Sequence, residues 1–201
     1  MEFVVATKMA QILEIPYTNN VIPVDLTLNN FYRGTYLLTN KPGINAGSVD
    51  IDEKNSIMWE LDTYFDEDYK FHSTYYNLPV MVADPDITDE LFNEWKADFA
   101  EMEKAVYNVN SADYIDLDVY ARYLLVYDLC QNVELQHPKS VKLYKTKGDG
   151  EKYIFGPIWD FDGAMGYWIS GQMFDLALIK NRVTLHAFFQ ALEKDPLVRE
   201  A

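Results

Sequence analysis

Basic residues and cysteines are scarce in this chain of 201 residues, and long apolar runs are absent. Lys and Arg total 17 against 32 Asp and Glu, which gives a formal net charge of −15. This excess of acid argues against non-specific binding to nucleic acid and against docking on anionic lipid, because both depend on Lys and Arg. The single cysteine, Cys130, excludes an internal disulfide. No apolar run reaches the roughly 18 to 20 residues that a membrane-spanning helix needs.

Several common catalytic motifs are also missing. The sequence has no G-x-S-x-G, no Walker loop, no zinc-type set of Cys and His and no G-x-G-x-x-G. These absences remove the common hydrolase, P-loop and dinucleotide-binding interpretations. Hydrophobic residues at 49% and aromatic residues at 15% are instead typical of a folded domain. A chain of this length, residues 1–201, normally forms one domain, or two small ones.

Strand patterns dominate the first half of the chain. Alternation of apolar and polar residues predicts strands at Ile22–Leu28 and Phe31–Thr39, joined by a turn at Asn29 and Asn30. Gly34 interrupts the second strand and indicates a bulge.

Further strands are predicted downstream. They lie at Ile57–Asp62, Tyr69–Thr74, Leu78–Val82, Ser140–Thr146 and Lys152–Phe155. Because proline cannot donate to a sheet, Pro79 is expected to confine its strand to an edge at best.

Helical spacing of apolar residues appears at the start of the chain and through its second half. It predicts helices at Phe3–Ile15, Ile87–Val106, Leu117–Gln131 and Thr184–Leu192. Thr88 or Asp86 can cap the second helix and Asp116 the third. Strands and helices do not alternate strictly, so the pattern predicts an α+β fold with an antiparallel sheet packed against helices.

The densest candidate site is the segment that contains Asp160 and Asp162. In an extended segment these two carboxylates would point to one side, while Trp159 and Phe161 would pack on the other. Two carboxylates on one face can hold a hard cation such as Mg²⁺, which could clamp phosphates during phosphoryl transfer. A pair of turn-capping aspartates beside two core aromatics is the alternative.

A second candidate site follows the helix that ends near Gln131. Asn132 could end that helix or ligate a metal, and Glu134 could accept a proton from a hydroxyl nucleophile. A polar loop between helix and strand is the alternative, and His137 fits a loop position as well as a ligand. Glu60 and Asp62 form a third acidic pair, which a solvated strand face would explain.

Four segments, taken in order, resemble the CotH family, the spore coat protein H kinases. Val24–Thr39 matches the family hairpin V-L-x-L-N-G-x-Y-x-G-x-Y-L-L-T-E, and Met58–Asp62 matches L-L-E-I-D. Asp116–Ser140 matches the helix and the N-x-D/E loop after it, and Gly156–Asp162 matches G-P-V-W-D-F-D. The resemblance covers nearly the whole chain and implies an atypical protein-kinase-like domain.

The resemblance implies dependence on ATP and on Mg²⁺ or Mn²⁺, with transfer of phosphate to Ser or Thr of a protein substrate. Asp160 would be the metal-binding aspartate, equivalent to that of a kinase D-F-G, and Asp162 would be its neighbour. Glu134 falls on the loop acid, the base or metal-site residue, and Asn132 stands just before it. The family's usual settings imply a parent protein at the cell surface or secreted.

The chain departs from the family pattern in three ways, and these departures favour functions other than phosphate transfer. Glu134 replaces Asp, Asn40 replaces a frequent Glu, and the basic N-terminal segment expected to grip nucleotide phosphates is absent, which suggests a truncated domain. Lys8, Arg33 and Lys142 are the remaining candidate cations. The alternative function is a catalytically inactive kinase-like module in surface or coat assembly. A glycosidase that uses Asp160 with Glu134 is a third hypothesis.

Overall fold

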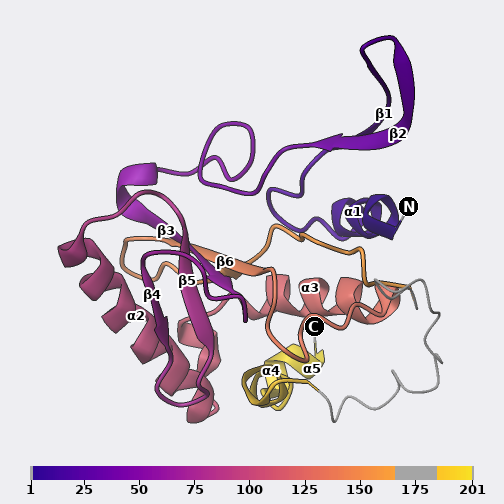
Figure 1. Ribbon diagram of the computed structural model, residues 1–201. Helices are drawn as coiled ribbons and strands as arrows, with labels where there is room; N and C mark the ends of the chain where they lie inside the picture. Colours follow the sequence, from indigo (N-terminus) through magenta and orange to yellow (C-terminus); the bar gives the residue numbers. More distant parts are fainter. Residues whose placement is uncertain (1, 166–184, 201) are drawn as a thin grey trace.

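The computed structural model describes residues 2–165 and 185–200, and these residues form an α+β fold (Figure 1). Its helices are α1 (Glu2–Ile12), α2 (Asp89–Tyr107), α3 (Leu117–Cys130), α4 (Ala187–Leu192) and α5 (Pro196–Glu200). Its strands are β1 (Val21–Leu28), β2 (Phe31–Thr39), β3 (Ser56–Leu61), β4 (Lys70–His72), β5 (Pro79–Asp84), β6 (Val141–Thr146) and β7 (Ile154–Phe155). The predicted elements are therefore confirmed, with ends shifted by a few residues. Thr184, the predicted start of the last helix, lies outside the described residues.

Five of the strands form one antiparallel sheet in the order β4-β5-β3-β6-β7. The prediction that Pro79 confines its strand to an edge is wrong, because β5 lies between β4 and β3. Pro79 is tolerated there because it is the first residue of β5, where its carbonyl still accepts a bond from the Asp62 N–H at 3.1 Å.

The main core lies between one face of this sheet and the helices. Trp59 of β3 is fully buried, and its ring meets those of Phe71 and Phe99 edge-on at 5.6 and 5.8 Å between centroids. Helix α2 is attached to the same face by Asp98, which accepts hydrogen bonds from Lys145 Nζ at 2.7 Å and Tyr153 OH at 2.6 Å.

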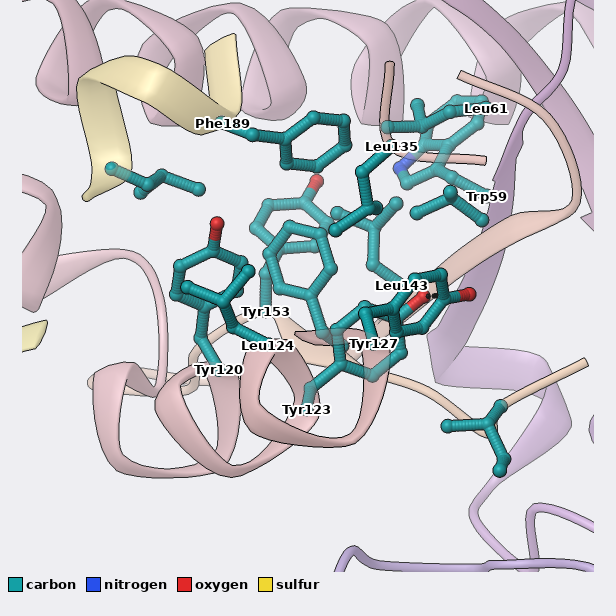
Figure 2. Packing of buried hydrophobic residues seen from close by; sticks show 14 of the residues in the cluster. Trp59, Leu61, Tyr120, Tyr123, Leu124, Tyr127, Leu135, Leu143, Tyr153 and Phe189 are labelled. Atoms are coloured by element: carbon teal, nitrogen blue, oxygen red, sulfur yellow. Dashed lines mark hydrogen bonds between the residues drawn. The ribbon is translucent and has the colours of Figure 1, made fainter. Parts of the chain in front are cut away.

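Helix α3 places a row of tyrosines in that core. Figure 2 shows Tyr120, Tyr123 and Tyr127 of α3 gathered near Phe189 of α4 and Leu143 of β6. Asp116 caps the helix as predicted, since its carboxylate accepts from the Val119 N–H at 3.0 Å. The helix ends at Gln131, which has a left-handed φ of 53°.

Strands β1 and β2 form a separate two-stranded hairpin that extends away from the five-stranded sheet (Figure 1). Asn29 and Asn30 have φ values of 52° and 62°, the left-handed backbone that a tight hairpin turn requires. The strand register shifts where Gly34, with φ at 110°, lies opposite Leu26, so the predicted bulge is confirmed.

The two faces of the hairpin differ in chemistry. On one face Asp25 accepts hydrogen bonds from Tyr32 OH at 3.2 Å and Thr35 Oγ1 at 2.8 Å. The other, which we name the apolar hairpin face, follows from strand alternation and the bulge. It consists of Ile22, Val24, Leu26, Leu28, Phe31, Tyr36 and Leu38.

Candidate functional site

The end of α3 positions the first candidate residues. The Asn132 N–H donates to the Tyr127 carbonyl at 2.9 Å and the Gln131 N–H to the Asp128 carbonyl at 3.1 Å, which closes the helix. The side chain of Asn132 then makes two hydrogen bonds. Its Oδ1 accepts from the Glu134 N–H at 2.8 Å, and its Nδ2 donates to the Asp160 carbonyl at 3.4 Å. Asn132 thus ends the helix and joins the Glu134 loop to the Asp160 segment.

Glu134 is a buried acid whose carboxylate has few polar partners among the described residues. Its side chain is 11% exposed, and Oε2 has no hydrogen-bond partner among the described residues. His137 Nε2 lies 3.7 Å from that oxygen. The pKa of Glu134 is raised to about 7, mainly by burial; the Lys139 ammonium lowers it, and the negative charges of Asp160 and Asp62 raise it. A carboxyl with such a pKa is suited to accept a proton near neutral pH.

Ser140 and Asp62 complete this part of the site. The Ser140 N–H donates to Asp62 Oδ2 at 3.0 Å, and the Ser140 hydroxyl lies 3.3 Å from Asp160 Oδ2. The other Asp62 oxygen accepts from the Tyr64 N–H at 2.7 Å. The expectation of a solvated acidic pair is therefore wrong for Asp62, which is 6% exposed. Its carboxylate is buried because it joins the end of β3 to the start of β6.

Glu60, the other member of that pair, is not solvated either. It lies opposite Lys142 in the β3–β6 register, and the two form an ion pair at 2.8 Å in which both side chains are largely buried. Lys142 is therefore already paired within the sheet. Arg33 lies on the exposed hairpin, and Lys8 is exposed on α1 and bonds to Gln11.

Asp160 and Asp162 line one pocket of about 350 Å³. Phe3 of α1, Leu37 and Thr39 of β2, and Trp159 form the remainder of the lining. The pocket therefore lies where the hairpin, the first helix and the Asp160 segment meet.

The segment that carries the two aspartates is not extended. Asp160 has a left-handed φ of 53°, so the expectation of an extended strand is wrong there. Phe161 is fully buried, as expected, but Trp159 lines the same pocket as the aspartates instead of packing away from them. Ser140 also has a positive φ of 54°, and such backbone conformations in non-glycine residues concentrate at functional sites.

A comparison with protein families agrees with this arrangement. A family model described as CotH kinase protein matches residues 5–199, nearly the whole chain. The chain belongs to the CotH kinase family. Membership of this kinase-like family, together with the α+β fold, accords with the resemblance of the four segments. No curated protein matches the sequence.

The site of this CotH chain contains oxygen donors of the kind that a divalent cation takes. Asp160 and Asp162 offer oxygen donors to one pocket, and Glu134 has a buried oxygen without a hydrogen bond in the described part of the chain. Residues 2–165 and 185–200 contain no group of three or more His, Cys, Asp or Glu placed to hold a metal. Mg²⁺ is usually bound by one or two carboxylates together with substrate phosphates, so this donor set fits. No helix within those ranges is long and apolar enough to cross a membrane.

Sequence reasoning did not assign three residues to this site. Asp62 lay within a segment that resembles a family motif, but its position on a strand face gave no sign that it would be buried. The sequence predicts Ser140 only as the first residue of a strand, and Lys139 as part of the polar loop before it. Their role depends on contacts with residues far away in the sequence, and no local pattern encodes these.

Proposed function

We propose that this CotH protein is an ATP- and divalent-metal-dependent phosphotransferase that acts on Ser or Thr of another protein. The observation that carries the proposal is the joining of two motifs. The Glu134 loop and the Asp160 segment are linked through Asn132 and through Ser140, and Asp160 also lines the pocket.

In this proposal each residue has a defined task. Asp160 and Asp162 hold Mg²⁺ or Mn²⁺ at the pocket, with the Asn132 amide oxygen as a further donor. When bound, the metal offsets negative charge on the nucleotide phosphates. Asn132 also keeps the Glu134 loop at a fixed position relative to Asp160.

Glu134 acts as the base for the acceptor hydroxyl. The Ser or Thr O–H gives its proton to the Glu134 carboxylate while the hydroxyl oxygen forms a bond to the γ-phosphorus of ATP. The bond from that phosphorus to the bridging oxygen breaks, and ADP leaves with the electron pair. A base pKa of about 7 keeps Glu134 partly ionised at neutral pH while making it a stronger proton acceptor than an ordinary carboxylate.

The test separates nucleotide binding from transfer. Calorimetric titration with Mn²⁺-ATP should show binding that requires both the metal and Asp160, so Asp160→Asn should abolish it. Glu134→Gln should keep binding but lose transfer by roughly 100-fold or more. Asp149→Asn, in an exposed turn, is the matched control and should behave as wild type. Equal binding by wild type and Asp160→Asn would reject the assignment.

A catalytically inactive module in surface or coat assembly is the second candidate. The apolar hairpin face favours it, since Phe31 is 68% exposed, Leu38 60% and Ile22 57%. Exposed apolar side chains gathered on one surface are typical of binding interfaces. Absence of any Mn²⁺-ATP binding in the titration would favour this candidate.

A further inference from the structure

Among the described residues, Lys139 is a cation of the loop that bears the acidic residues of the site. It directly precedes Ser140, whose backbone and hydroxyl contact Asp62 and Asp160. Its Nζ lies 4.8 Å from the centroid of the Tyr64 ring, and the Tyr64 N–H is bonded to Asp62. The adjacent backbone is attached to the same loop, because the Thr63 N–H donates to the Pro138 carbonyl at 3.0 Å. These contacts attach the Lys139 segment to the loop that bears the acidic residues.

The surroundings of Lys139 stabilise its charged form. Burial opposes the charged form, but the carboxylates of Glu134 and Asp160 outweigh burial, so the pKa of Lys139 is raised. The same ammonium acts on Glu134 in the opposite direction and lowers its pKa. Lys139 is thus a positive charge that interacts with both the proposed base and the proposed metal-binding aspartate.

The number of residues between Glu134 and Lys139 indicates a role for this charge. In protein kinases an asparagine stands five residues after the catalytic-loop aspartate and, with the D-F-G aspartate, holds two Mg²⁺ ions. Counting five residues from Glu134 leads to Lys139. An ammonium has three donors and no acceptor, so it cannot ligate a cation as an asparagine does. It can instead donate directly to phosphate oxygens.

We propose that the Lys139 ammonium takes the place of the second divalent cation, so that this site binds one metal ion per nucleotide. This inference rests on the proposed function, since it concerns the same nucleotide site. It also supplies a phosphate-binding cation that Lys8, Arg33 and Lys142 do not provide.

Counting the bound metal tests the inference without measuring activity. The full chain is titrated with Mn²⁺ in the presence of a non-hydrolysable ATP analogue, and free Mn²⁺ is followed by electron paramagnetic resonance. Wild type should bind one Mn²⁺ per bound nucleotide. Lys139→Asn, which restores an amide oxygen, should bind two.

Lys139→Met is the matched control, because it removes the charge without adding a ligand. It should still bind one Mn²⁺, and its nucleotide affinity should fall by about 10- to 100-fold, as expected for one lost charge-assisted hydrogen bond. Thermal unfolding of each variant shows whether it is folded.

The outcomes separate the two proposals. Two Mn²⁺ per nucleotide in wild type, or one in a folded Lys139→Asn, would overturn the role of Lys139 and leave the proposed function standing. If wild type binds no nucleotide in the presence of Mn²⁺, both the proposed function and this inference fail.

Discussion

The β1–β2 hairpin and the five-stranded sheet are built from similar sequence patterns but end in opposite surroundings. In the sheet, Ile57, Trp59 and Leu143 are fully buried under helices. In the hairpin, Leu26 and Leu28 alternate with polar residues in the same way, yet they remain 40% and 53% exposed. The difference shows that alternation specifies a strand and its two faces, whereas burial depends on whether a helix or a loop covers one of them.

The comparison extends to polar side chains. Glu103 of α2 is 1% exposed and accepts hydrogen bonds from the Ser73 hydroxyl and from three consecutive backbone N–H groups, those of Thr74, Tyr75 and Tyr76. Asp25 of the hairpin accepts two side-chain hydrogen bonds, and it is exposed to solvent. A buried acceptor cannot exchange a lost bond for one to water, so the loss of each bond costs more free energy at Glu103 than at Asp25.

The largest contrast is expected for two phenylalanines. Phe99→Ala in the core should lower the free energy of unfolding by about 3–5 kcal/mol, because it leaves a cavity beside Trp59. Phe31→Ala on the hairpin, where the ring is 68% exposed, should change it by less than about 0.5 kcal/mol. Urea unfolding followed by tryptophan fluorescence measures both. A similar loss in the two variants would show that the apolar hairpin face is covered in solution.

A smaller contrast is expected for the two acids. Glu103→Ala should cost about 2–4 kcal/mol, because it leaves the Ser73–Tyr76 turn without its buried acceptor. Asp25→Ala should cost about 0.5–1 kcal/mol at most, because water replaces the carboxylate. Unfolding of both variants in urea at one pH provides the measurement. Equal costs would contradict the difference in burial.

The smallest contrast in stability is expected between wild type and Glu134→Gln, because burial of Glu134 disfavours its ionised form. Its pKa in the folded protein is about 7, above the usual 4.5. The stability contributed by its protonated form is complete below the lower value and is lost as pH rises through the higher one. The glutamine side chain of the Glu134→Gln variant cannot ionise. The free energy of unfolding of this variant, relative to that of wild type, should therefore rise by about 1–2 kcal/mol between about pH 5 and pH 8. Parallel pH profiles of urea unfolding in chelator would contradict this.

Part of the candidate site could be read from the sequence. Asn132, Glu134, Asp160 and Asp162 stand in segments whose composition and order resemble the CotH family. That resemblance could not reveal that Asp160 takes a left-handed backbone or that Trp159 shares its pocket. Both features follow from packing of the segment against α1 and β2, which lie more than a hundred residues earlier in the chain.

The sequence by itself determined the elements of this protein. Periodicity, capping residues and turn asparagines specify where helices and strands begin and end, because these depend on neighbours along the chain. Only the tertiary structure decided that Pro79 starts an inner strand, that Asp62 is buried, and that Ser140 bonds to two acids of the site. Strand order and burial result from contacts between distant segments, and local residue patterns carry no record of those contacts.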